Sequence, residues 1–98
     1  MYTGIVQAVA EVVSVNHQMG LTTLTLALNE SMRRDLQQGA SVAVDGVCLS
    51  VVKQEGERVS FDAMQETLNK TTLGLLEVGS RVNVERSARQ GDEVGGHI

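Results

Sequence analysis

Residues 39–67 read GASVAVDGVCLSVVKQEGERVSFDAMQET, and a tight turn divides their first half into two runs of alternating side chains. Asp45-Gly46 lies between the runs Ser41–Val44 and Val47–Val52. A two-residue Asp-Gly loop favours a β-hairpin, because glycine adopts a positive φ angle at no steric cost. These residues therefore predict two antiparallel strands joined by a short turn.

A second turn signal, Glu55-Gly56, precedes the run Arg58–Ala63, so we expect a third strand to fold back on the second. Successive side chains of a strand point to opposite faces, so one face of the middle strand can belong to a core while the other lines a cavity. One face carries Val47, Leu49 and Val51, and the other carries Cys48, Ser50 and Val52.

The chain on either side predicts three further strands. Thr3–Val15 is rich in valine and lacks the polar stripe of a helix, which favours a strand. His17–Gly20 predicts a turn into a strand at Leu21–Leu28, and Arg81–Arg86 predicts the last strand. The side chains expected to face the core are Leu24, Leu26, Leu28, Val82 and Val84.

One short helix is predicted at Glu30–Gln38. Asn29 is a suitable N-cap, the Glu30 carboxylate suits the positive end of the helix dipole, and Gly39 is a stop signal. Residues 66–76 are ambiguous, because two adjacent threonines disfavour a helix while the spacing of the leucines is compatible with one short turn.

Six short strands, ten glycines and no proline predict an all-β fold, a six-stranded closed barrel with one or two short helices. Closure removes exposed strand edges, and an open sandwich is the alternative. The 98 residues suffice for one domain. We assign residues 1–87 to the barrel and the glycine-rich, polar residues 88–98 to a linker-like tail.

Composition argues against several classes of partner. A net charge of −4 repels nucleic-acid phosphates, and 2 % aromatic residues are too few to stack single-stranded bases. No run approaches the roughly 20 apolar residues that a membrane-spanning helix needs. The start lacks the basic segment of a secretory signal and a single cysteine forms no internal disulfide, so we expect a cytoplasmic protein.

The residues with reactive side chains form few patterns typical of catalysis. Cys48 has no histidine near it in sequence except His97 in the tail, which favours a thiol in a pocket or core wall over a nucleophile. His17 and His97 are predicted to be solvated, and no cluster has the spacing of a zinc site. No phosphate-binding glycine loop is present, so no phosphate-bound cofactor is indicated.

Asp62, Glu66 and Thr67 lie together where the predicted fifth strand ends. Paired carboxylates at such a position serve as general acid and base in some enzymes. The alternative is that Asp62 accepts backbone hydrogen bonds and Glu66 is solvated, and composition alone favours it. Ser41 and Ser50 lie on neighbouring strands of one hairpin and present hydroxyl groups to a polar ligand.

Five ordered motifs together resemble the riboflavin synthase family. The resemblance covers the whole chain but only the amino-terminal half of the length usual in that family. The motifs are MYTGIVQ at the start, VDGVCLSVV, VSFDAMQETL, VNVERSAR and the terminal GGHI.

The resemblance implies a Greek-key barrel that binds 6,7-dimethyl-8-ribityllumazine or riboflavin. In that family two lumazine molecules dismutate to riboflavin and a ribitylamino-uracil without a metal or organic cofactor. The implied role of the protein is to orient two heterocycles, an effect worth roughly 7 to 11 kcal/mol when the geometry is good.

Carried over to this sequence, the family motifs assign the ligand-binding residues. The wall that contacts the ring would comprise Gly4, Ile5 and Val6, with Cys48, Leu49 and Ser50 opposite them. Asp62, Ala63, Met64 and Thr67 would hold the ribityl chain, with Ser41 as a further hydroxyl. The catalytic residue stays open, with Ser41 and Cys48 as candidates. Tyr2 and Ser50 depart from the phenylalanine and threonine usual in the family.

In the family the chain continues into a second barrel, and the productive site forms between the first barrel of one subunit and the second barrel of its neighbour. We therefore predict ligand binding with little turnover. The resemblance implies a homodimer for the isolated domain and a homotrimer for the full-length enzyme. A non-catalytic lumazine or flavin carrier and an unrelated interaction module are the alternatives.

Overall fold

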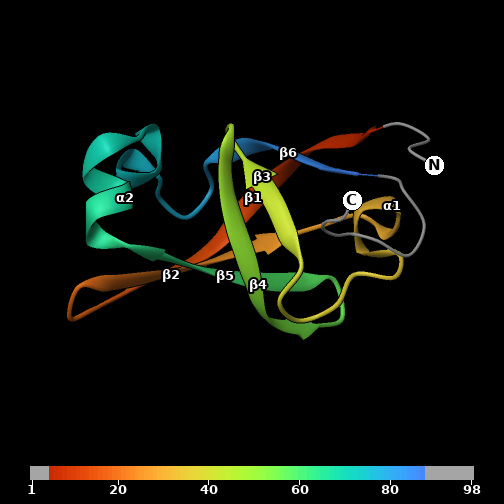
Figure 1. Ribbon diagram of the computed structural model, residues 1–98, viewed down its shortest axis with the longest axis horizontal. Helices are drawn as coiled ribbons and strands as arrows, with labels where there is room; N and C mark the ends of the chain where they lie inside the picture. Colours follow the sequence, from red (N-terminus) through yellow and green to blue (C-terminus); the bar gives the residue numbers. More distant parts are fainter. Residues whose placement is uncertain (1–4, 88–98) are drawn as a thin grey trace.

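The computed structural model describes residues 5–87 (Figure 1). Six strands dominate it, with two short α-helices and one 3-10 helix between them. The strands are β1 (Ile5–Gln18), β2 (Leu21–Ala27), β3 (Ser41–Val44), β4 (Val47–Glu55), β5 (Arg58–Met64) and β6 (Arg81–Ser87). The helices are α1 (Glu30–Arg33), α2 (Gln65–Lys70) and the 3-10 helix η1 (Thr72–Leu75).

The six strands form a closed antiparallel barrel in the order β1-β2-β5-β4-β3-β6, with β6 pairing β1 to complete the circle. Strands β3, β4 and β5 follow one another as hairpins, and β6 returns to lie beside β3, which is a Greek key. The predicted closed barrel is confirmed. Closure also places β1 opposite β4, because two strands separate them in either direction.

The barrel interior is filled by alternate side chains from every strand. The five inward-facing residues predicted from the sequence are all buried, as is the one phenylalanine, Phe61. On β4 the buried face carries Leu49 and Val51, whereas Cys48 and Ser50 are exposed, so the alternation resolves which face is core. One buried polar side chain among residues 5–87 is Thr22, whose hydroxyl lies 2.8 Å from Nδ1 of His17.

The β3–β4 turn has the geometry that its Asp-Gly sequence predicts. Asp45 and Gly46 have φ angles of 48° and 84°, the positive values of a type I′ hairpin. The Asp45 carboxylate accepts a hydrogen bond from the Asn83 main-chain nitrogen at 2.8 Å, and the Asp45 nitrogen donates to the Asn83 carbonyl at 2.7 Å. These contacts tie the tip of the hairpin to β6.

The helix predicted at Glu30–Gln38 is wrong in length, because α1 ends at Arg33. Its start is confirmed, since Oδ1 of Asn29 accepts from the Met32 nitrogen at 2.9 Å. Arg34 is extended and Asp35 has a φ angle of 57°, so the chain leaves the helix immediately after Arg33. The local pattern favours a longer helix, but Arg86 of β6 donates hydrogen bonds to the Met32 and Arg34 carbonyl groups, which the next helical turn would need.

Three other boundaries differ from the prediction. His17 belongs to β1, where it pairs with Thr22, so the predicted turn shrinks to Met19-Gly20. Strand β4 continues past Val52 to Glu55, with an irregularity in its pairing between Val51 and Lys53. The ambiguous residues 66–76 contain most of α2 and all of η1, and Oγ1 of Thr71 caps η1 by accepting from the Leu73 nitrogen.

Candidate functional site

Strands β4 and β5 pair along only part of their lengths. Their ladder runs from Glu55–Arg58 to Val51–Phe61. Beyond this ladder, residues 47–50 of β4 pair with β3 alone, and residues 62–64 of β5 pair with β2 alone. The β4 edge that faces β5, and the β5 edge that faces β4, are therefore unpaired in these two segments. Figure 1 shows β4 continuing to the β3–β4 turn while β5 leads into α2. We call this unpaired stretch between the two strands the β4–β5 gap.

The β4 side of the gap carries small polar side chains. Ser41 and Ser50 are register partners on β3 and β4, as predicted, and both are exposed. Cys48 is also exposed on the outer face, so it belongs to no core wall. Its thiol forms no hydrogen bond within residues 5–87. Nothing in the described chain therefore activates it as a nucleophile.

The β5 side of the gap carries Asp62 and Met64, which point outward. Asp62 is half-buried, and its Oδ1 accepts a hydrogen bond of 2.6 Å from Oγ1 of Thr23. Met64 is 64 % exposed and offers a polarizable thioether to the opening. Thr67, half-buried on α2, follows in the chain, and its carbonyl accepts from Oγ1 of Thr71.

Not every predicted site residue presents its side chain to the gap. Leu49 and Ala63 are 6 % and 2 % exposed, so their side chains belong to the core and only their main-chain atoms border the gap. The carboxylates of Asp62 and Glu66 have different partners: Asp62 accepts a hydrogen bond from Thr23, and Glu66 forms an exposed ion pair with Lys70 at 3.2 Å. The geometry therefore supports hydrogen-bonding to a ligand more than paired acid–base chemistry.

Two residues of the predicted ring-binding wall, Ile5 and Val6, do not border the β4–β5 gap. Ile5 and Val6 begin β1, where they pair with Ser87 and Arg86 of β6. Because β1 is opposite β4 in the barrel, these residues and the β4–β5 gap are on opposite sides of one chain. Gly4 lies outside the described residues, as do Tyr2 and His97.

A separate hollow of about 720 Å³ lies between β1, β6, the β3–β4 turn and η1. Its lining includes Gln7, Val9, Asp45, Thr72, Asn83 and Glu85, and none of the predicted ligand-binding residues. The sequence carries no signal for this hollow, because four segments distant along the chain assemble it. The Thr23–Asp62 contact was missed for the same reason.

Residues 5–87 contain no group of three or more His, Cys, Asp or Glu side chains able to hold a metal ion. In the same part of the chain, no helix has the length and apolar character needed to cross a membrane.

A closed six-stranded Greek-key barrel places the chain among the small all-β barrel domains. Residues 3–87 match the family described as the lumazine binding domain, and the chain belongs to this family.

Curated relatives of the chain include riboflavin synthases of several bacteria. The chain is 49 % identical over 98 residues to riboflavin synthase of Escherichia coli strain K12, covering all of this chain and 46 % of the relative. It is 43 % identical over 100 residues to riboflavin synthase of Mycobacterium bovis, covering all of this chain and 49 % of that protein. The chain thus spans about half the length of the curated relatives it matches.

Solved structures of LumP share the fold. LumP complexed with riboflavin aligns with a TM-score of 0.76 at 30 % identity, over 87 % of this chain and 46 % of that one. LumP complexed with 6,7-dimethyl-8-(1'-D-ribityl) lumazine aligns with a TM-score of 0.74 at 28 % identity, over 93 % of this chain and 49 % of that one.

Proposed function

We propose that this chain is the amino-terminal domain of a riboflavin synthase and that it binds 6,7-dimethyl-8-ribityllumazine or riboflavin at the β4–β5 gap. One observation carries the proposal: the two strand edges stop pairing where Ser50 and Asp62, both assigned to the ligand by the sequence motifs, border the opening. Family membership and the ligands of the LumP structures support it.

The chemistry of the gap suits such a ligand. Unpaired strand edges offer main-chain N–H and C=O groups, which need partners when a ligand excludes water. Lumazine and flavin both carry a pyrimidinedione edge that alternates carbonyl acceptors with an imide N–H donor, and a strand edge is complementary to this pattern. The Ser41 and Ser50 hydroxyls and the Asp62 carboxylate add hydrogen-bonding groups for the sugar-alcohol chain.

We propose that the isolated domain turns over slowly or not at all. Dismutation needs two lumazine molecules side by side, and residues 5–87 form one such gap. Alignment of two reactants is worth roughly 7 to 11 kcal/mol of the barrier, and a single binding surface supplies little of it. The whole enzyme would gain the second surface from a second barrel, and the curated relatives are long enough to contain one.

We propose further that the domain forms a homodimer, and that the assembly of the full-length enzyme is a homotrimer. The topology supports a contribution from a second copy: Ile5 and Val6 begin β1, across the barrel from the gap, so they would reach a ligand there from a neighbouring chain. A two-fold pair is the commonest arrangement for such a mutual contact. Sedimentation over a range of protein concentrations tests this, and a monomer at all concentrations would exclude the homodimer.

The alternative is a non-catalytic carrier of a lumazine or flavin. The LumP structures favour it, since they are complexes with riboflavin, flavin mononucleotide and the ribityl lumazine. The higher identity to the synthases, 49 % against 30 %, favours the enzyme half. Sustained conversion of lumazine to riboflavin by a longer form of the protein would decide for the synthase.

The test of ligand binding is titration of the 98-residue chain with riboflavin, followed by flavin fluorescence. The chain has no tryptophan, so protein emission adds little background. Ser50→Phe should block the gap and strongly weaken binding. Lys53→Phe changes an exposed residue in the paired part of β4 and should bind like the parent chain. An unchanged flavin signal with the parent chain, or equal effects of both variants, would contradict the proposal.

A further inference from the structure

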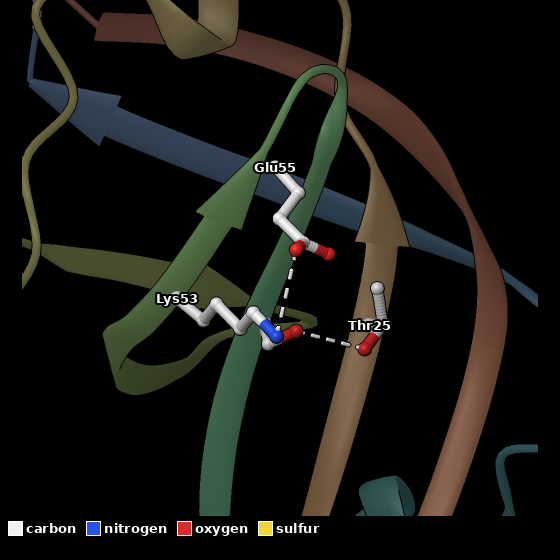
Figure 2. A network of polar contacts seen from close by, with 4 residues as sticks. Thr25, Lys53 and Glu55 are labelled. Atoms are coloured by element: carbon white, nitrogen blue, oxygen red, sulfur yellow. Dashed lines mark hydrogen bonds and ion pairs between the residues drawn. The ribbon is translucent and has the colours of Figure 1, made fainter.

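Two hydroxyl-bearing pairs cross from β2 to β5 on the outer surface of the barrel. Thr23 faces Asp62 in the register, and its Oγ1 donates to Oδ1 of that carboxylate at 2.6 Å. Two residues along, Thr25 faces Ser60, with 2.9 Å between their hydroxyl oxygens (Figure 2). All four side chains are half-buried, so the two pairs share strands, face and depth.

Their positions along β5 differ. Ser60 pairs with Lys53 of β4, in the closed part of the wall beside the exposed Lys53–Glu55 ion pair (Figure 2). Asp62 is the first residue of β5 beyond the β4–β5 ladder, at the border of the gap. A carboxylate therefore lies where the β4–β5 ladder ends, and a hydroxyl group of β2 donates a hydrogen bond to it.

We propose that Thr23 is a positioning residue that orients the Asp62 carboxylate toward the sugar-alcohol chain of the ligand. This inference rests on the proposed function, which assigns the ligand to the gap. The terminal torsion of an aspartate is broad, and a hydrogen bond to Oδ1 restricts it. Oδ2 has no protein partner within the described chain, so it is free to accept from ligand hydroxyls.

The expected gain comes from pre-organisation. Hydrogen bonds to an ionised acceptor are shorter and stronger than those between neutral groups. Ordering a side chain before the ligand arrives removes an entropy cost from binding, which corresponds to roughly a 2- to 10-fold change in Kd. Thr23 touches no ligand itself in this scheme, and its effect passes through Asp62.

The test compares Thr23→Val with Thr25→Val, since each removes one hydroxyl and keeps a β-branched side chain on the same face of β2. Thr23→Val should raise the Kd for riboflavin roughly 2- to 10-fold. Thr23→Ser keeps the hydroxyl group and should have the Kd of the parent chain. Thr25→Val should leave the Kd unchanged, although both valine variants should lose similar thermal stability.

A second ligand separates positioning from general damage. Lumiflavin has the flavin ring without the ribityl chain, so its Kd should be the same for the parent chain and Thr23→Val. Equal weakening of riboflavin and lumiflavin, or no weakening of either, would overturn the role of Thr23. If the parent chain binds neither riboflavin nor lumiflavin, the proposed function itself is overturned.

Discussion

Nη1 of Arg86 on β6 lies 2.9 Å from the main-chain carbonyl oxygen of Met32 in α1 and donates a hydrogen bond to it. The same nitrogen donates to the Arg34 carbonyl, also at 2.9 Å. Burial lowers the pKa of the Arg86 guanidinium, and the nearby Asp35 carboxylate partly offsets this. The contact satisfies carbonyl groups at the end of α1 that the helix itself leaves without partners.

Replacing Arg86 should therefore loosen the connection between α1 and the barrel. We expect Arg86→Met to lower the free energy of unfolding by about 1 to 3 kcal/mol, because two carbonyl groups lose a charged donor. Arg81→Met alters an exposed arginine on the same strand and should have little effect. Urea unfolding followed by circular dichroism measures both, and equal losses would contradict the assignment.

The barrel interior should be far more sensitive than its outer face to the same substitution. Val84 on β6 is 0 % exposed, whereas Val9 on β1 is 63 % exposed. Val84→Ala should cost about 2 to 3 kcal/mol through lost burial and an unfilled cavity. Val9→Ala should stay within about 0.5 kcal/mol of the parent chain. Thermal unfolding of the two variants compares them, and a similar cost at Val9 would show that this surface is covered in solution.

Two exposed methionines provide a matched test of the gap. Met64 borders it, and Met19, 97 % exposed, lies in the β1–β2 turn. Contact of a thioether with an aromatic ring is worth about 0.3 to 1.5 kcal/mol. Met64→Ala should weaken riboflavin binding by a corresponding factor of roughly 2 to 10, and Met19→Ala should leave it unchanged. Flavin fluorescence titration checks both, and equal Kd values would place the ligand away from Met64.

The single cysteine reports on the same opening. Cys48 is exposed, so the native chain should react readily with a thiol reagent such as dithionitrobenzoate. Saturating riboflavin should slow this reaction by covering the β4 side of the gap. The Cys48→Ser variant gives the blank. A rate that riboflavin does not alter would argue against a ligand beside Cys48, and reaction only after unfolding would contradict its exposure.

Much of the local structure follows from short-range patterns. The Asp45-Gly46 turn, the Asn29 cap and the inward leucines of β2 were all predictable, because turn chemistry and strand alternation depend on neighbouring residues. Pairing of Ser41 with Ser50 followed from the same hairpin. The length of α1 was not predictable, since Arg86 contacts it from the far end of the chain.

The candidate site likewise has features that the sequence predicts and features that it does not. Family motifs nominated Ser50, Asp62 and Met64, but no local pattern could indicate that β4 and β5 separate beyond Val51–Phe61. Nor could it indicate that Thr23 holds the Asp62 carboxylate.

Local sequence suffices to predict the strands, their turns and the faces they bury, since backbone preference and side-chain alternation act over a few residues. The unpaired edges of β4 and β5, and the position of Ile5 across the barrel from the gap, follow from the folded arrangement alone. Those properties depend on the order in which six strands close, which brings together residues far apart in the chain.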